Sequence, residues 1–457
     1  MSLVSINPAT GQRLHIHGLH SSVQIEHALA LAHSAHHGWR ETTPAFRARH
    51  LRALGRILRL QRDDLAALIT AEMGKPVTQA RAEIEKCAAV CDYYARHGAE
   101  WLAEAHSPAA PKHTRVACEP LGVVLAIMPW NFPFWQLFRA AVPALMAGNT
   151  ILLKHASNVS DCALAIAQVF VDAKVPAGLL QTLLITAREV PALIADPRIS
   201  AVTLTGSTAA GRAVAALAGA ALKPCVLEMG GSDAYLILED ADLEHAAETC
   251  AAARLVNAGQ SCVSAKRFIV VGKIRREFER RLVARLKARQ PGDPADPQTV
   301  LGPLARHDLR DELHGQVQRS VRRGARLLLG GRIPAGPGWF YPPTVLTRVK
   351  PGMPAYSEEL FGPVAAIIPV RDEAEAVTVA NDSIYGLGAA IFTRDRRRAR
   401  ELAPQIAAGM VFINDFVRSD PSLPFGGIKQ SGFGRELGRP GLRAFVNLKT
   451  IWMGPAR

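Results

Sequence analysis

The N-terminal quarter of the chain has the spacing of apolar residues that is typical of amphipathic helices. From Ser22 to Ala105, apolar side chains recur mostly three and four residues apart, which predicts helices that each bury one face. The sequence Gly74-Lys75-Pro76 interrupts the pattern. Glycine followed closely by proline predicts the end of one helix and the start of the next.

From about residue 114 onward, short apolar runs alternate with stretches of helical spacing. This alternation predicts parallel sheets with helices on both faces. The runs form two series, which indicate two successive α/β units, a cofactor domain and then a catalytic domain. The first series comprises residues 122–129, 150–154, 181–185, 201–205 and 223–227, and the second comprises 267–271, 326–329, 364–370, 389–393 and 410–414. Residues 447–453 predict a terminal strand, which we expect to pair with another sheet, such as that of a partner subunit.

Length and composition agree with a two-domain globular protein. A chain of 457 residues is too long for one ordinary core, and 49% hydrophobic with 21% charged residues is globular composition. No apolar run reaches the roughly 20 residues of a membrane span, and the N-terminus has no leader pattern. The seven cysteines are scattered and odd in number, which favours a reducing compartment. We therefore expect a cytoplasmic protein that does not associate with membranes.

The net charge of +14 raises the alternative of a basic nucleic-acid-binding protein without catalytic activity. The arginine-rich runs at 273–281, 319–326 and 394–400 lie where helices are predicted, and no nucleic-acid-binding motif accompanies them. We interpret them as solvated helix faces and expect no nucleic-acid partner. Part of the charge could still attract an anionic substrate or a phosphate-bearing cofactor.

Two residues have the surroundings of catalytic groups. Cys262 follows the small and polar residues Gly-Gln-Ser, which would give a thiolate nucleophile access to substrate. A small buried core residue is the alternative for Cys262, and it is our interpretation of each of the other six cysteines. Glu228 ends an apolar run before two glycines, at the edge of a sheet where sites form. Partial burial would suit it to general-base catalysis; a structural carboxylate is the alternative.

Three further motifs are ambiguous when taken singly. Asn131, in a turn between two prolines, could donate to an alkoxide or cap the following helix. The sequence 205–211 follows a strand and opens a helix, which suits a pyrophosphate, but it matches neither common glycine-rich fingerprint. The loop 357–363 places two carboxylates beside an aromatic residue, a combination that suits ribose hydroxyls and a ring face but also occurs in surface turns.

The joint order of these motifs resembles the aldehyde dehydrogenase superfamily over nearly the whole chain. Within that family the chain is most similar to bacterial succinate-semialdehyde dehydrogenases, through residues 154–158, 230–233, 264–268 and 302–306. The motifs that carry the family resemblance are Pro129-Trp-Asn-Phe-Pro133, Lys154, Thr205-Gly-Ser-Thr208, Leu227-Glu-Met-Gly-Gly231, Gly259-Gln-Ser-Cys262, Glu358-Glu-Leu-Phe-Gly-Pro363 and Pro424-Phe-Gly-Gly-Ile-Lys-Gln-Ser-Gly432.

The resemblance implies an α/β fold with a Rossmann-type cofactor domain, an α/β catalytic domain and a small oligomerisation arm. Residues 1–105 and 124–230 would form the cofactor-binding domain and residues 231–436 the catalytic domain. Residues 106–123 and 437–457 would form the arm, which in the family makes homodimers or homotetramers.

The resemblance also assigns roles to individual residues, and it implies no metal site. Cys262 would be the nucleophile, Glu228 the base for thioester hydrolysis, and Asn131 with the Cys262 backbone amide the oxyanion hole. The residues implied for the cofactor are Trp130, Lys154, Ser157, Gly206, Ser207, Glu359 and Phe361.

The expected cofactor is NADP, with NAD also usable. NAD-selective relatives often carry a glutamate three residues after the ribose-binding lysine, and its charge would repel a 2′-phosphate. Here that position is Ser157, whose hydroxyl can donate to the phosphate, with Lys154 close enough to pair with it.

The expected substrate is an aldehyde with a carboxylate at its far end, with succinic semialdehyde as the best candidate. Arg139 interrupts an apolar stretch and shares a helix face with Trp135, four residues earlier. A cation there needs an anion. We expect a substrate carboxylate to supply it, because arginine binds carboxylates bidentately; an internal Glu or Asp is the alternative. By resemblance, Ser419 would add a hydrogen bond, while Trp135 and Phe425 would enclose the aliphatic chain.

Three other enzyme activities remain as alternative hypotheses. The enzyme could act on another short aldehyde or semialdehyde, or it could be a coenzyme-A-acylating relative, although Glu228 stands where hydrolytic members carry their base. A Cys-His hydrolase is the third alternative, but no histidine motif of that kind is present in the sequence.

Overall fold

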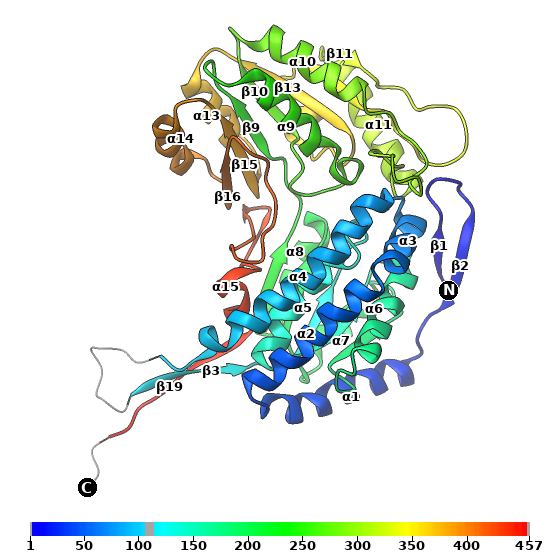
Figure 1. The fold of residues 1–457 in the computed structure, drawn as a ribbon, viewed down its shortest axis with the longest axis vertical. Coiled ribbons are helices and arrows are strands. Elements are labelled where there is room, and N and C mark those ends of the chain that lie inside the picture. Colours follow the sequence, from blue (N-terminus) through cyan, green and yellow to red (C-terminus); the bar gives the residue numbers. More distant parts are fainter. Residues whose placement is uncertain (1, 106–113, 455–457) are drawn as a thin grey trace.

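The computed structural model describes residues 2–105 and 114–454. Two sheets dominate it, a six-stranded sheet of order β18-β8-β7-β4-β5-β6 and a seven-stranded sheet of order β11-β12-β13-β10-β9-β15-β16. Helices flank each sheet, and the two layered units occupy opposite ends of the molecule in Figure 1. The expected α/β fold class is therefore confirmed.

The N-terminal segment is helical, as its apolar spacing predicts. Its helices are α1 (Ser22–Arg40), α2 (Pro44–Leu60), α3 (Arg62–Met73) and α4 (Val77–Leu102). Gly74, at φ 74°, ends α3 in the left-handed conformation that glycine adopts without strain. Pro76 immediately precedes α4, so the predicted helix break is confirmed. A hairpin of β1 (Ser2–Ile6) and β2 (Arg13–Gly18) precedes these helices.

The six-stranded sheet contains all five strands of the first predicted series. They are β4 (Val123–Ile127), β5 (Thr150–Lys154), β6 (Leu180–Leu183), β7 (Ile199–Thr205) and β8 (Cys225–Glu228), and all of their pairings are parallel. The helices between them are α5 (Trp135–Ala147), η1 (Ser157–Val159), α6 (Ser160–Asp172), α7 (Val190–Ala195) and α8 (Thr208–Ala220). Residues 123–126 of β4 are all buried, as expected for a strand covered on both faces. The sixth strand, β18 (Gly432–Phe433), runs antiparallel to β8.

The seven-stranded sheet contains the second predicted series. Its strands are β9 (Ala234–Ile237), β10 (Arg267–Val271), β11 (Arg326–Leu329), β12 (Thr344–Thr347), β13 (Val364–Val370), β15 (Gly388–Phe392) and β16 (Met410–Ile413). Its helices are α9 (Leu243–Leu255), α10 (Arg275–Lys287), α11 (His307–Arg322), α12 (Pro354–Ser357), α13 (Glu373–Asn381) and α14 (Arg396–Leu402). Short elements complete it: η2 (Val256–Gly259), η3 (Ala403–Gln405), β14 (Tyr385–Gly386) and β17 (Ile428–Lys429). The sequence pattern missed β9 and β12, which have four residues each.

The C-terminal strand takes part in a two-stranded extension. After α15 (Gly438–Arg443), β19 (Val446–Ile451) pairs antiparallel with β3 (Arg115–Pro120), and the pair projects from the body in Figure 1. The predicted terminal strand is confirmed, but its partner strand in the structure belongs to the same chain. Residues 106–113 and 455–457, also expected to belong to the arm, lie outside the described residues.

The arginine-rich runs lie on or beside helices, as the interpretation of solvated faces requires. On α10, for example, the side chains of Arg280 and Arg281 both pair with Glu277. In the part of the chain that the structure describes, no helix has the length and apolar character needed to cross a membrane.

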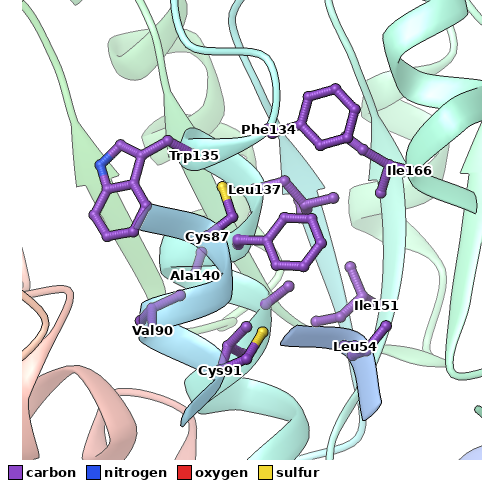
Figure 2. Close-up of a cluster of buried hydrophobic side chains, with 14 of the residues drawn as sticks. Leu54, Cys87, Val90, Cys91, Phe134, Trp135, Leu137, Ala140, Ile151 and Ile166 are labelled. Atoms are coloured by element: carbon purple, nitrogen blue, oxygen red, sulfur yellow. The ribbon is translucent and has the colours of Figure 1, made fainter. Parts of the chain in front are cut away.

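The packing of α4 against α5 forms the core beside the candidate site. Cys87 and Cys91 of α4 lie fully buried among apolar side chains such as Leu137 and Ile151 (Figure 2). Burial raises the pKa of the Cys87 thiol well above its usual range, so it stays neutral. All seven cysteines are unpaired, and the core interpretation of Cys87 and Cys91 fits their surroundings.

Candidate active site

The loop before Cys262 has a strained backbone at two residues. In η2, Asn257 and Ala258 have φ of 53° each, a left-handed conformation rare for residues with a Cβ. Such strain costs on the order of 1–3 kcal/mol per residue and persists only where surrounding contacts impose it. Here the side-chain amide of Asn257 donates to the backbone carbonyls of Asn131 at 2.7 Å and Gln260 at 3.1 Å. The Cys262 loop is thereby tied to the turn that carries Asn131.

Cys262 is a partly exposed thiol in a site that disfavours its ionisation. Burial raises its pKa to about 12, although the charges of Arg139 and Lys266 oppose that rise. Lys266 also fixes the loop, because its ammonium donates to the carbonyls of Ser261 at 2.9 Å and Cys262 at 2.7 Å. The resting Cys262 side chain is therefore a neutral thiol, and it would need a proton acceptor to act as a nucleophile.

Two N–H donors belong to residues that line the cavity at Cys262. The amide nitrogen of Asn131 donates to the Gln260 carbonyl at 3.0 Å, and Asn131 and Cys262 line the same cavity. Over residues 2–105 and 114–454, the backbone N–H of Cys262 has no hydrogen-bond acceptor. An alkoxide formed on Cys262 could therefore take up both donors.

Glu228 ends β8 in a fully enclosed position. It is 1% exposed, and neither carboxylate oxygen has a hydrogen-bond partner among the described residues. Burial, reinforced by the charge of Glu436, raises its pKa well above the usual range, while Arg139 opposes the rise. Glu228 lines neither of the two cavities that meet at Cys262. A protonated carboxyl in this position becomes a base only after it loses its proton and reaches toward Cys262.

A cavity of about 580 Å³ on one side of Cys262 brings most of the expected cofactor residues together. Its volume is in the range of small-molecule sites. The rings of Trp130 and Phe361 meet edge to face in its wall, with centroids 5.8 Å apart. The expected residues that line it are Trp130, Asn131, Gly206, Ser207, Cys262, Glu359 and Phe361.

This cavity fits a dinucleotide. Ser207 caps α8, its hydroxyl accepting from the Ala210 N–H at 3.3 Å, so the N-terminus of α8 faces the cavity and favours an anion. The Glu359 carboxylate accepts from the Gly231 N–H at 3.1 Å and pairs with Lys266 at 3.3 Å. A Cβ at Gly230 would lie 2.3 Å from that carboxylate, so glycine is needed for the close approach.

Lys154 and Ser157 lie apart from the walls of that cavity, at the end of β5 and the start of η1. Among the described residues the Lys154 ammonium has no hydrogen bond or ion pair, and burial lowers its pKa. Ser157 is exposed. A cation without a partner beside an exposed hydroxyl fits a phosphate group, although the structure does not bring these two residues into the cavity itself.

A second cavity, of about 320 Å³, opens on the other side of Cys262. Cys262 and Gln136 line both cavities, so the thiol stands where the two meet. The four residues expected to bind substrate all line the second one: Trp135, Arg139, Ser419 and Phe425. The indole N–H of Trp135 donates to the Ser419 hydroxyl at 3.1 Å, which joins helix α5 to the loop after β16.

The expectation that Arg139 needs an anion from the substrate has to be corrected. Its guanidinium is buried and forms an ion pair with Glu436. It also donates to the Thr205 hydroxyl at 3.2 Å and lies 4.4 Å over the ring of Phe425. The internal partner, the alternative that the sequence left open, is present because the segment after β18 brings Glu436 to α5.

Comparisons with known proteins agree with this arrangement. The model of the aldehyde dehydrogenase family matches residues 2–451. The chain belongs to the aldehyde dehydrogenase family. It is 51% identical over 449 residues to an Escherichia coli succinate semialdehyde dehydrogenase named for NAD(P)+, covering 98% of this chain and 97% of that protein. A probable NADP+-dependent succinate-semialdehyde dehydrogenase of Synechocystis is 48% identical, over 99% of this chain and all of that protein.

Among solved structures, the aldehyde dehydrogenase resembles a Streptococcus pyogenes succinic semialdehyde dehydrogenase crystallised with NADP+. The TM-score is 0.96 and the identity 38%, over 99% of this chain and all of that chain. The fold expected from the sequence resemblance is thereby confirmed.

Sequence reasoning missed four charged residues of this aldehyde dehydrogenase: Lys86, Lys266, Glu436 and Glu83. Glu83 on α4 accepts from the backbone N–H groups of Phe134 at 2.9 Å and Trp135 at 3.0 Å, and so caps α5. A signal for Lys86 and Glu83 was available, because both share the helical stretch with the buried Cys87. For Glu436 the sequence offers none, because its partner lies 297 positions away.

One group of side chains could hold a metal ion, although none is expected from the sequence. His15 and His17 of β2 lie beside Asp161, with ligand atoms within 4.8 Å of one another. Both imidazoles are hydrogen-bonded to the Asp161 carboxylate, at 2.7 and 2.9 Å, which accounts for the grouping. These residues line neither cavity at Cys262.

Proposed function

We propose that this aldehyde dehydrogenase oxidises succinic semialdehyde to succinate with NADP, and that NAD can replace NADP. The observation that carries the proposal is the position of Cys262 between two cavities. One has the size of a dinucleotide site, and the smaller one is lined by basic side chains and by the Ser419 hydroxyl. The names of the relatives support the substrate and the cofactor.

In the first half-reaction, the Cys262 thiol gives up its proton to solvent water in the cavity, and the sulfur adds to the aldehyde carbon. The carbonyl oxygen becomes an oxyanion, which the Asn131 amide and the Cys262 backbone N–H stabilise. The nicotinamide, when bound, supplies the hydride acceptor that converts this thiohemiacetal into a thioester. The protein's part is to hold the sulfur, the oxyanion and the aliphatic chain in fixed positions.

In the second half-reaction, water attacks the thioester and the Cys262 thiolate leaves. Glu228 takes the proton of that water, which its raised pKa favours once the carboxylate is ionised. A hydrolytic base distinguishes this route from a coenzyme-A-acylating one, in which a second thiol would release the acyl group.

For the cofactor, Trp130 and Phe361 would flank the nicotinamide end, and Gly206 and Ser207 would approach the pyrophosphate. Glu359 and Lys154 would bind the two riboses, and the absence of a carboxylate at Ser157 leaves room for a 2′-phosphate. Both phosphate groups would meet positive potential, from the α8 N-terminus and from Lys154.

The proposal also covers the domains of the chain, its assembly into oligomers and its location. Residues 1–105 and 124–230 would act as the cofactor domain, residues 231–436 as the catalytic domain, and the segments 106–123 and 437–457 as an arm that joins subunits. We infer a homodimer or homotetramer in the cytoplasm, where the seven unpaired thiols would stay reduced. Sedimentation of the purified enzyme at micromolar concentration would reveal a monomer if this inference is wrong.

The substrate is tested by comparing kcat/KM for succinic semialdehyde and for butanal, which lacks the carboxylate, with each cofactor in turn. We expect succinic semialdehyde to be preferred by at least tenfold. Equal values would replace this proposal by the alternative of a dehydrogenase for other short aldehydes.

A further inference from the structure

The second cavity beside Cys262, of about 320 Å³, is lined by one basic side chain that forms no ion pair with any described carboxylate. We call it the substrate-side cavity. Three basic side chains line this cavity: Lys86, Arg139 and Arg418. Arg139 is paired with Glu436, and Arg418 with Asp415 at 2.8 Å. Within residues 2–105 and 114–454, no carboxylate oxygen lies within 4 Å of the Lys86 ammonium.

Lys86 is held in place by uncharged groups. It projects from α4, and its ammonium donates to the Ser419 hydroxyl at 2.7 Å and lies 4.4 Å from the centre of the Trp135 ring. A lysine at this depth in a cavity gives up much of its hydration, and a balancing anion would restore that lost stabilisation. The cavity beside Lys86 leads to Cys262.

The Ser419 hydroxyl also has a proton that is free to donate to an anion beside Lys86. Its oxygen accepts two hydrogen bonds, one from Lys86 and one from the Trp135 indole at 3.1 Å. A hydroxyl has two acceptor lone pairs and one proton, and both lone pairs are thus used. The remaining Ser419 proton, like the remaining protons of the Lys86 ammonium, needs an acceptor.

We propose that Lys86, with Ser419 as its hydrogen-bonding partner, binds the distal carboxylate of the substrate and determines the preference for semialdehydes over neutral aldehydes. This inference rests on the proposed function and assigns its selectivity to a residue on α4. Arg139 adds positive potential to the wall of the same cavity, but its Nε already forms an ion pair with Glu436.

The test is Lys86→Met, which keeps most of the side-chain volume and removes the charge. We expect its kcat/KM for succinic semialdehyde to fall at least tenfold, mainly through KM, with less than about threefold change for butanal. Lys86→Arg keeps a cation and should retain most of the preference. Arg81→Met is the matched control, because it removes a cation of the same helix that pairs with Asp63 outside the cavity.

The outcomes separate this inference from the proposed function. If the wild type shows no preference for succinic semialdehyde over butanal, the proposed function and this inference both fail. If the wild type shows the preference and Lys86→Met keeps it, or if Arg139→Met alone abolishes it, only the role of Lys86 is overturned. Equal losses for both aldehydes in Lys86→Met would make Lys86 structural and would likewise overturn the inference.

A pH profile provides a readout that a structural role would not change. Burial, with the charge of Arg139, lowers the pKa of Lys86 to about 8. The other groups that face it are Glu83, Cys87 and Asp420. The ratio of kcat/KM for succinic semialdehyde to that for butanal should therefore fall as pH rises through about 8, and it should be flat in Lys86→Met. A wild-type ratio that stays constant from pH 7 to 9 would contradict the proposal.

Discussion

Arg139 and Glu436 form an ion pair in the protein interior, with side chains that are 2% and 1% exposed. Removing one partner of such a pair leaves a buried charge uncompensated, which costs about 3–5 kcal/mol. We therefore expect Arg139→Met to lower the midpoint of chemical denaturation markedly, as followed by circular dichroism.

The matched control for this prediction is the double substitution Arg139→Met with Glu436→Met. Replacing both charges by apolar groups of similar size is often close to neutral, so the double variant should recover much of the stability that the single variant loses. If the double variant instead loses as much stability as Arg139→Met and Glu436→Met lose together, the two charges do not interact.

Cys262→Ala should abolish aldehyde oxidation, because among the described residues no other cysteine lines either cavity, while cofactor binding and circular dichroism stay unchanged. Mild peroxide should oxidise Cys262 without forming a disulfide in its own loop, since position 264 is a serine whose hydroxyl donates to the Ala253 carbonyl at 2.7 Å. Steady-state kinetics check the first point, and peptide mass spectrometry after peroxide treatment checks the second. A disulfide that includes Cys262 would refute the second.

Glu228→Gln should slow thioester hydrolysis more than the first half-reaction, since an amide of nearly the same shape cannot take a proton. Rapid mixing should then show a burst of about one reduced cofactor per active site, followed by a slow steady rate. The raised pKa of Glu228 means that its carboxylate ionises only as pH increases. The wild-type deacylation rate should therefore rise with pH through that pKa, and the rise should be missing in the variant; equal steady rates would exclude Glu228 as the base.

Ser157→Glu should raise KM for NADP at least tenfold and change KM for NAD much less, because a carboxylate would repel the 2′-phosphate. Ser157→Ala is the control, since it removes the hydroxyl without adding charge, and we expect only a small loss with NADP. Steady-state kinetics with both cofactors measure this. A wild-type enzyme that prefers NAD by more than about tenfold, roughly 1.4 kcal/mol, would overturn the assignment.

The strands and helices that follow from local patterns were largely predictable. The ten predicted strands of the two sheets all appear. Nine of them have parallel neighbours, as short apolar runs between helices predict, whereas β11 is an edge strand that pairs antiparallel with β12. The strands β9 and β12 were missed. In β12 only Val345 and Leu346 are apolar, between two threonines, so no run stands out. β9 is buried throughout and belongs to the same kind of run as the predicted strands, so its omission has no local reason.

The site was predictable where one motif carries the chemistry, as at Cys262 and Asn131, which line one cavity. It was not predictable where the decisive relationship joins distant segments. Arg139 looked unpaired because Glu436 follows it by 297 positions. Lys86 shares a helical stretch with the buried Cys87, but only its contact with Ser419, 333 positions later, places it at the site.

The strand that carries Glu228 has its edge covered by β18, in which Gly432 pairs with Glu228 and the Ser431 hydroxyl donates to the Gly230 carbonyl at 2.6 Å. During synthesis at about 5–20 residues per second, the ribosome needs roughly 10–40 s to get from one segment to the other. The parallel strands can assemble during that interval, but the edge at Glu228 stays open until β18 has been synthesised. Nascent chains are therefore expected to acquire catalytic competence only after β18 has been made, well after the parallel strands of the six-stranded sheet.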